Sequence, residues 1–308
     1  YTTDEWALIL GGSSGFGLAV ATKLAAHGMS VCVVHRDRRG AMPRIEAGFD
    51  AIRAHGHGFV ALNLDALSAE GVSTTIEAVR VAMGPSGRVK ALLHSIAFGN
   101  LKPIAPAVGT PPAALAVQRL ADELGVAVAD LEQIVTRLTG EGVDPLQALI
   151  SPPQTDARLD DEDIARTVFS MGTSLLSWVQ RLFGEGLFAA DARVFGLTSE
   201  GNSVVWRGYA AVATAKVALE SVSRAIAVEF GPHGIRSNIL QPGVTDTAAL
   251  RLIPGSAHMA AHARMRNPMG RLTTPEDVAN VVCLLCAPEA AWINGALIHI
   301  DGGEHVSA

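Results

Sequence analysis

The stretch Trp6-Ala-Leu-Ile-Leu10-Gly-Gly-Ser-Ser-Gly15-Phe-Gly17 decides the fold of this 308-residue chain. A short apolar run, typical of a buried strand, ends directly in a glycine-rich turn, and a helical pattern follows. Strand, turn and helix in this order are typical of a dinucleotide-binding unit, although a glycine cluster can also form an ordinary turn. Gly11 would make the turn, Gly15 would let backbone amides approach a pyrophosphate, and Gly17 would let helix and strand pack closely.

Further strand and helix patterns alternate along the chain. The expected strands cover residues 6–10, 30–34, 58–62, 89–94, 192–197, 237–240 and 296–300, and the expected helices include residues 70–83, 161–183 and 275–286. This alternation predicts an α/β protein with a Rossmann-type, doubly wound parallel sheet. Because a chain of this length with 49% hydrophobic residues can bury one large core, we predict a single reductase-type domain over residues 1–308.

The alternation breaks between residues 101 and 160. This segment contains two helical patterns, residues 113–124 and 128–138, and is far longer than the roughly 2 to 6 residues of an ordinary strand-to-helix loop. It therefore predicts a helical insertion, placed over or beside the substrate mouth or in an oligomer contact. The spacing around Gly125 also fits a DNA-binding helix-turn-helix, but its acidic surroundings would repel phosphate, so a helical hairpin is favoured. Residues 248–270 are expected to form a mobile flap rather than regular core.

Charge and cysteine content argue against several classes of protein. A formal net charge of -6 gives no electrostatic footprint for nucleic acid or an anionic membrane, so neither partner is expected. Cys32, Cys283 and Cys286 lie in apolar runs, which is typical of small buried hydrophobes in a reducing compartment, and no metal site is expected. No apolar run reaches the roughly 18 residues of a membrane span and no signal-peptide pattern is visible, so we expect a cytoplasmic protein.

The end of the second expected strand carries a basic run. His35 and Arg36 stand where an acidic group would bind the ribose hydroxyls of NAD, which favours a 2'-phosphate and therefore NADPH over NADH. A solvated basic loop is the alternative. After the fourth expected strand, the stretch Ser95-Ile-Ala-Phe-Gly99 places small residues at a carboxyl end, where ligands bind in open α/β sheets.

Tyr209 and Lys216 form the expected catalytic pair. Seven residues are about two helical turns, so both side chains lie on one face of a helix, roughly 10 Å apart along its axis. A phenol and an ammonium on one face can polarise the same bound molecule. A surface lysine beside a half-buried tyrosine is the alternative.

These stretches together resemble the short-chain dehydrogenase/reductase superfamily and, within it, the enoyl-acyl-carrier-protein reductases. The motifs that carry the resemblance are Gly11-x3-Gly15-x-Gly17, His94-Ser-Ile-Ala-Phe98, Tyr209-x6-Lys216, Ala218-Leu-Glu-Ser-Val222, Gly234-Ile-Arg-Ser-Asn238, Pro242-Gly-Val-Thr-Asp-Thr247 and Asp301-Gly-Gly303. Most superfamily members carry a tyrosine four residues before the lysine, where this chain has Val212, which cannot donate a proton. The enoyl reductases place the tyrosine seven residues before it, as this chain does.

The resemblance implies NADPH-dependent reduction of the 2,3 double bond of an enoyl thioester, on acyl carrier protein or coenzyme A, in fatty-acid or polyketide-type metabolism. In that reaction the hydride enters C3 while negative charge develops on the carbonyl oxygen of C1. Moving the tyrosine by three residues shifts its hydroxyl about 4.5 Å along the helix, towards such an oxygen. Other readings are a reductase of another conjugated or cyclic carbonyl compound and a non-catalytic NADP(H)-sensing protein. The superfamily also suggests a homodimer or homotetramer.

The resemblance assigns roles residue by residue. The implied catalytic residues are Tyr209, which would hydrogen-bond the enolate, Lys216, which would bind the nicotinamide ribose, and Ser199, which would assist Tyr209 or cap a loop. The implied cofactor-binding residues are Gly11, Ser13, Ser14, Gly15, Phe16, Gly17, His35, Arg36, Asn63, Leu64, Ser95, Ile96, Ala97, Lys216, Pro242, Gly243, Val244, Thr245 and Thr247. The implied substrate-binding residues are Phe98, Gly99 and Tyr209.

Two positions depart from the superfamily pattern. Asn63-Leu64 replaces the Asp-Val pair after the third strand, where an amide can still serve the adenine. The asparagine usually found on the helix before the fifth strand is absent, with Ser170 and Met171 near its place. The usual proton-relay water therefore loses its asparagine ligand.

Overall fold

The computed structural model describes residues 1–151, 155, 157–204, 206–253 and 255–307. In these residues seven parallel strands form one sheet in the order β3-β2-β1-β4-β5-β6-β7. The strands are β1 Glu5–Leu10, β2 Ser30–His35, β3 Phe59–Asn63, β4 Arg88–His94, β5 Phe188–Leu197, β6 Ile235–Pro242 and β7 Leu297–Ile300. The order reverses between β1 and β4, so the predicted Rossmann-type, doubly wound sheet is confirmed, and a crevice is expected at the carboxyl ends of these two strands.

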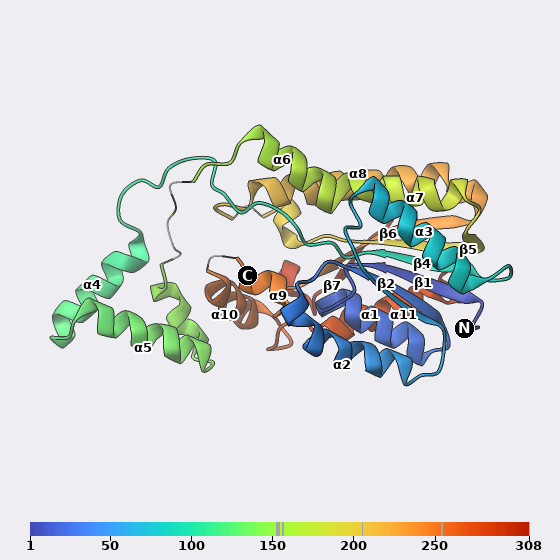
Figure 1. Ribbon diagram of the computed structural model, residues 1–308. Helices are drawn as coiled ribbons and strands as arrows, with labels where there is room; N and C mark the ends of the chain where they lie inside the picture. The colour runs from blue at the N-terminus through green and yellow to red at the C-terminus, as the bar shows by residue number, and fades with distance from the viewer. Residues whose placement is uncertain (152–154, 156, 205, 254, 308) are drawn as a thin grey trace.

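Helices cover both faces of the sheet (Figure 1). One face carries α1 Gly15–Ala26, α2 Met42–Arg53 and α11 Pro275–Cys286, and the other carries α3 Ala69–Met83, α7 Ser174–Gly184 and α8 Ala210–Glu229. Alternate strand residues serve the two cores, because Ile9 packs with the first group of helices and Leu8 with the second. Cys32, Cys283 and Cys286 are buried in these layers, as expected from their apolar surroundings. Among the described residues, no helix has the length and apolar character needed to cross a membrane.

The expected helix at residues 161–183 is interrupted. It consists of α6 Asp161–Val168, a π-helical turn at Phe169–Thr173, and α7. Within the turn, the Ser170 hydroxyl donates to the carbonyl oxygens of Phe98 and Thr167. The π turn thereby holds the chain that leaves β4. Such turns are frequent at functional sites.

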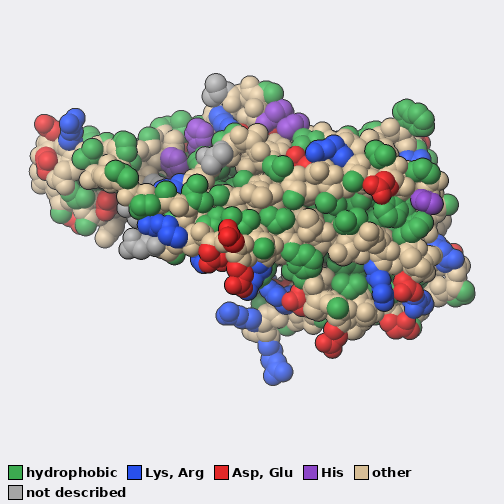
Figure 2. Space-filling model, turned by 90° about the horizontal axis from the view of Figure 1, so that it is seen from above, with side chains coloured by type: hydrophobic (Ala, Val, Ile, Leu, Met, Phe, Trp, Pro, Cys, Tyr) green, Lys and Arg blue, Asp and Glu red, His purple; other side chains and the backbone are tan. Residues whose placement is uncertain are grey.

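The insertion forms an arm that projects from the domain (Figure 1). Its helices are α4 Pro112–Leu124 and α5 Val128–Gly140, and Gly125 makes the turn between them with a left-handed φ of 67°. Figure 2 shows hydrophobic side chains among charged ones on the surface of this arm. A 3₁₀ turn, η2 Asp144–Leu149, follows α5 and leads back towards the domain.

Residues 248–270, which were expected to form a mobile flap rather than regular core, contain regular structure. They contain two helices, α9 Ala248–Arg251 and α10 Ser256–Arg266. The base of the insertion is fastened to α10, because Arg264 makes a bidentate ion pair with Asp144 at 2.7 and 2.9 Å and the His258 ring bonds to the Gln147 carbonyl oxygen at 2.9 Å. The segment therefore obtains its order partly from the insertion, 120 residues earlier in the chain.

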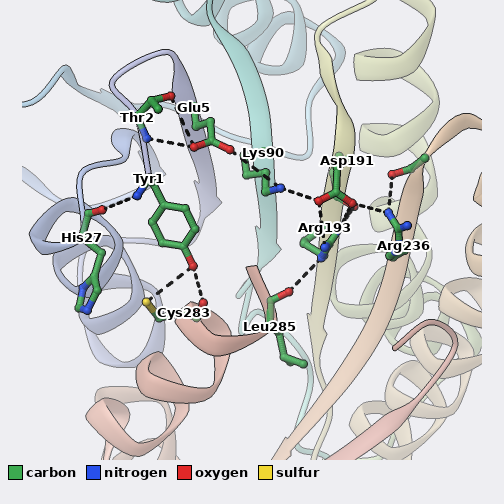
Figure 3. A network of polar contacts seen from close by, with 12 residues as sticks. Tyr1, Thr2, Glu5, His27, Lys90, Asp191, Arg193, Arg236, Cys283 and Leu285 are labelled. Carbon is green, nitrogen blue, oxygen red and sulfur yellow. Dashed lines mark hydrogen bonds and ion pairs between the residues drawn. The ribbon is translucent and has the colours of Figure 1, made fainter. Parts of the chain in front are cut away.

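A charged network spans the amino-terminal half of the sheet (Figure 3). Asp191 on β5 accepts hydrogen bonds from Lys90 on β4, from Arg193 on β5 and from Arg236 on β6. Arg193 is buried and also donates to the carbonyl oxygen of Leu285 on α11. Burial alone would raise the pKa of Asp191, but these hydrogen bonds outweigh it and hold the pKa at about 2. The network fixes three strands far from the carboxyl ends, where the candidate site lies.

Candidate active site

A cavity of about 320 Å³ opens at the carboxyl ends of the central strands. Its walls come from the loops after β1, β4, β5 and β6, from α8, and from the segment that contains α9 and α10. The lining includes the predicted residues Gly11, Ser14, Gly15, Phe16, Ser95, Ile96, Ala97, Gly99, Ser199, Tyr209, Lys216, Pro242, Gly243, Val244, Thr245 and Thr247. The predicted residues outside the lining are Ser13, Gly17, His35, Arg36, Asn63, Leu64 and Phe98. The cavity lies at the switch point of the sheet, where ligands of open α/β sheets bind.

The glycine-rich turn leaves no room for larger side chains. A Cβ atom on Gly11, whose φ is 87°, would lie 2.4 Å from the Ser95 carbonyl oxygen, and one on Gly17 would lie 2.1 Å from the Gly11 carbonyl oxygen. Helix α1 begins at Gly15 beside the cavity, and within the described chain no side chain caps its first turn. Uncapped amides at a helix amino terminus suit a pyrophosphate, so this turn fits a dinucleotide cofactor.

Tyr209 stands at the start of α8 rather than inside it. Its backbone is at the N-cap position, with φ of -102°, so the assumption of one continuous helix from Tyr209 to Lys216 fails at the first residue. Its hydroxyl lies 3.4 Å from the Ser199 hydroxyl, and its ring packs against Gly201. Burial raises the pKa of the phenol, and the Ser199 hydroxyl opposes this shift only in part. The phenol therefore stays protonated at neutral pH and can donate a hydrogen bond into the cavity.

Lys216 supplies the cationic group of the cavity. The residue is 8% exposed, and its ammonium donates to the Leu197 carbonyl oxygen at 2.7 Å. Burial lowers the pKa of Lys216 to about 8, although the nearby carboxylate of Glu220 acts in the opposite direction. An ammonium has three donors, so one anchors the side chain to β5 and two can serve a ligand.

Val212 makes an apolar wall where most superfamily members would carry the tyrosine. It belongs to a small buried cluster with Met171 and Ala215, against which Leu101 and Tyr209 pack. The wall offers a hydrocarbon surface and no donor. The phenol of Tyr209 lies at the start of α8, about one turn before this wall.

Residues at the end of β2 have different orientations. The His35 ring is buried against Phe49 and bonds to Asp37 at 2.9 Å. Its side chain therefore cannot face a 2'-phosphate, so the predicted contact between His35 and this phosphate is wrong. Arg36 points outward, pairs with the exposed carboxylate of Asp65 at 2.9 Å, and covers the Phe98 ring at 4.7 Å. An exposed ion pair of this kind is weak, and a phosphate could displace it.

Phe98 and Asn63 both lie outside the cavity lining. The Phe98 ring lies under Arg36, so the structure shows it against this guanidinium and not in the cavity wall. The Asn63 amide bonds to both the backbone N–H and the carbonyl oxygen of Asp37. It holds the loop after β2, and Leu64 continues this contact by donating its N–H to the His35 carbonyl oxygen.

Several residues of the site had no signal in the sequence. Trp206, Leu252, Ile253 and Met259 line the cavity, and three of them come from residues 248–270. Arg266 of α10 pairs with both Glu200 and Glu304, and Glu304 accepts a hydrogen bond from the Val244 N–H beside the cavity. These contacts join distant segments, so only the fold brings them together.

Two family models match the chain. The model described as "short chain dehydrogenase" matches residues 5–107, and the model described as "Enoyl-(Acyl carrier protein) reductase" matches residues 147–305. The residues between these matches include the whole of α4 and α5. Neither model therefore covers the two helices of the arm.

Similar proteins include other short-chain reductases, and similar solved structures have the same fold. The short-chain reductase protein NovJ of Streptomyces niveus is 26% identical over 97% of this chain and 94% of its own. Protein FixR of Bradyrhizobium diazoefficiens is 31% identical over 57% of this chain and 64% of its own length, so the match spans less than two thirds of that relative. A short-chain dehydrogenase of Burkholderia cenocepacia, solved in complex with NADP, superposes with a TM-score of 0.69 at 23% identity over 98% of each chain. A short-chain dehydrogenase/reductase of Serratia marcescens has a TM-score of 0.69 at 22% identity over 97% of each chain.

Proposed function

The chain belongs to the short-chain dehydrogenase/reductase superfamily of oxidoreductases, and we propose that it uses NADPH to reduce the 2,3 double bond of an enoyl thioester. One observation carries the proposal. The cavity has a half-buried, protonated phenol at Tyr209, beside the Ser199 hydroxyl, and a hydrocarbon wall at Val212. An acid so displaced suits an oxygen three bonds from the carbon that accepts hydride, as in a conjugated thioester, rather than an oxygen bonded directly to that carbon, as in a ketone.

Tyr209, Ser199 and Lys216 have different roles in the proposed reaction. NADPH supplies the hydride when bound. The Tyr209 hydroxyl donates to the thioester carbonyl oxygen and stabilises the negative charge that develops there, while Ser199, 3.4 Å away, orients the phenol. Lys216 holds the nicotinamide ribose through the donors that Leu197 leaves available, and its positive charge favours the enolate.

The cavity walls support an acyl substrate. Leu101, Met171 and Val212 form one apolar side, and Leu252 and Met259 contribute from the opposite segment. A hydrocarbon chain gains free energy on entering such a wall because it leaves water. The mouse peroxisomal 2,4-dienoyl-CoA reductase, named for a conjugated thioester substrate, is 38% identical to this chain over 90 residues, which are 29% of this chain and 31% of its own.

The preference for NADPH rests on Arg36. Its guanidinium is half exposed at the end of β2 and is held in place by Phe98 and Asp65. A 2'-phosphate would replace the Asp65 carboxylate as the anionic partner and would accept charge-assisted hydrogen bonds. Asp37, which could bind ribose hydroxyls, is already bonded to His35.

The test compares two thioesters of equal chain length. Loss of nicotinamide absorbance is followed with crotonyl-coenzyme A and with acetoacetyl-coenzyme A at equal concentrations of protein and NADPH. We expect faster oxidation of NADPH with the crotonyl substrate, since no acid lies at the Val212 position that a ketone at C3 would need. Faster turnover of the acetoacetyl substrate would overturn the proposal. Binding of NADPH without turnover of either thioester would point to another conjugated carbonyl substrate.

A further inference from the structure

Three potential metal ligands meet where the sheet ends, away from the cavity that contains Tyr209. His299 is on β7, Asp301 follows this strand, and His305 is in the 3₁₀ turn η7 Glu304–Val306. One ligand atom from each of them lies within 4.8 Å of the others. The two imidazole rings stack with centroids 3.7 Å apart and planes 9° apart. Both rings are exposed, while Asp301 is 6% exposed.

We propose that His299, Asp301 and His305 form a binding site for a divalent transition metal ion, with Zn²⁺ as the ion that the ligand set favours. Two imidazole nitrogens and one carboxylate oxygen are ligands that zinc accepts, and three protein ligands leave a fourth position for water. Calcium and magnesium prefer sites built from oxygen atoms alone. The chemistry of the ligands therefore selects the class of ion.

The turn that carries these ligands is ordered without a metal ion. The Asp301 carboxylate accepts hydrogen bonds from the backbone N–H groups of Gly303 and His305 and bonds to the Nδ1 atom of His305. The backbone already brings the ligands together, but the two rings are stacked with planes 9° apart. Because an imidazole nitrogen coordinates in the plane of its ring, at least one ring must rotate for both to bind the same ion.

The site has space for an open coordination position. His299 and Asp301 line a surface cavity of about 500 Å³, which also includes Asn267 and Thr273 and is separate from the cavity that contains Tyr209 and Lys216. Water can therefore reach the fourth position of an ion held here. In the sequence these residues form the pattern His299-x-Asp301-x3-His305. This spacing alone does not predict a metal site, because it is the turn after β7 that brings the three side chains together.

Another pair of histidines provides a matched control. His258 and His262 stack on α10 with centroids 6.4 Å apart, and His258 bonds to the Gln147 carbonyl oxygen. Among the described residues, no third potential ligand lies close enough to complete a set of three with this pair. The double variant His258→Ala/His262→Ala removes the same number of imidazoles as His299→Ala/His305→Ala.

The ion would stabilise the turn after β7, which contacts the loop after β6 at Gly243 and Val244. Glu304, next to His305, accepts from the Val244 N–H, and the Gly243 N–H donates to the Ile300 carbonyl oxygen. An ion bridging β7 and η7 therefore fastens the turn that supports this loop. Bound Zn²⁺ should raise the thermal midpoint of unfolding, because the ion binds the folded chain and the unfolded chain has no assembled site.

The experiment uses the full chain without a histidine tag, and its result does not depend on the enoyl reductase proposal. Equilibrium dialysis against ZnCl₂ should show one ion per chain and a higher melting temperature. His299→Ala/His305→Ala should weaken binding by about tenfold or more and abolish the thermal shift. His258→Ala/His262→Ala should bind zinc and shift in melting temperature on binding like the wild type, even though loss of the His258 bond to Gln147 lowers its melting temperature without zinc. Because both rings are exposed, His299→Ala/His305→Ala should fold, which circular dichroism checks. As an independent test, Asp301→Asn should weaken the Co²⁺ absorption bands that the wild type shows on binding. Unchanged binding in the first variant, or loss of binding in the control variant, would overturn the proposal.

Discussion

The substitution Tyr209→Phe separates the chemistry of the phenol from its packing. The phenyl ring keeps its contacts with Gly201 and with the apolar cluster of Met171 and Val212, so only the hydroxyl is lost. Among described residues, that hydroxyl has one recorded bond, to Ser199, and at 3.4 Å it is long for an O–H···O hydrogen bond. Its removal should lower the free energy of unfolding by less than about 1 kcal/mol.

The effect on catalysis should be much larger. Removing one donor from an oxyanion site costs roughly 10²- to 10³-fold in turnover, which is about 2.7 to 4 kcal/mol of transition-state stabilisation. The Tyr209→Phe variant should therefore lose activity with crotonyl-coenzyme A while its affinity for NADPH, measured by fluorescence, and its melting temperature change little. Ser199→Ala should reduce turnover less, since it orients the phenol and does not touch the oxygen directly.

Full activity of Tyr209→Phe would refute this mechanism, because it would show that turnover does not need the Tyr209 hydroxyl as a donor. Equal losses of activity and of thermal stability would refute it as well, since they would mean that the hydroxyl serves the fold. A comparison of kcat and KM distinguishes these outcomes. Loss of an interaction made only in the transition state lowers kcat and kcat/KM equally.

Three further changes test the cofactor site, the lysine and the base of the insertion. Arg36→Ala should reduce the preference for NADPH over NADH by roughly 10- to 100-fold, the value of a charge-assisted contact, as measured by Kd for both cofactors; equal affinities in the wild type would contradict the assignment. The kcat/KM should fall as pH rises through about 8, because burial lowers the pKa of Lys216 to about 8 and the ammonium loses its charge above it; a rate constant up to pH 10 would exclude this role. Arg264→Met, which breaks the pair with Asp144, should raise KM for the thioester more than Kd for NADPH, whereas Arg137→Met on α5 should change neither.

Local patterns predicted most of the sheet, and tertiary contacts decided the exceptions. The apolar runs that became β1 to β7 were visible because buried parallel strands are nearly continuous hydrophobic segments. Helix α2 was not predicted, although Ile45, Phe49 and Ile52 have helical spacing, because it follows a basic run and contains Pro43 near its start. The π turn at Phe169–Thr173 could not be read either, since it depends on the contact between Ser170 and the backbone of Phe98.

The site could be predicted to the extent that it follows strand and helix periodicity. The proximity of Tyr209 and Ser199 follows from two motif positions at adjacent strand and helix ends, and the structure brings these hydroxyls together. His35 and Arg36 follow one another at the end of β2, where successive side chains point to opposite faces, so only one of them can face a ligand; His35 is the buried one and Arg36 the exposed one. The contributions of Leu252 and Met259 were not accessible, since they depend on how residues 248–270 fold over the cavity.

The contact between Arg264 and Asp144 explains why a point substitution tests the insertion better than its deletion. Helices α4 and α5 project away from the cavity, and it is η2, at the base of the arm, that is bonded to α10. Deleting residues 101–160 would remove Leu101 from the cavity wall together with the arm, so a change in thioester kinetics could not be assigned to either. Arg264→Met keeps Leu101, α4 and α5 and removes only the ion pair with Asp144, one of the two contacts that support α10. The same helix carries the Arg266 contact to Glu200. If substrate affinity then falls, the insertion acts through α10 on the shape of the cavity, and the outer part of the arm remains available for contacts with another subunit.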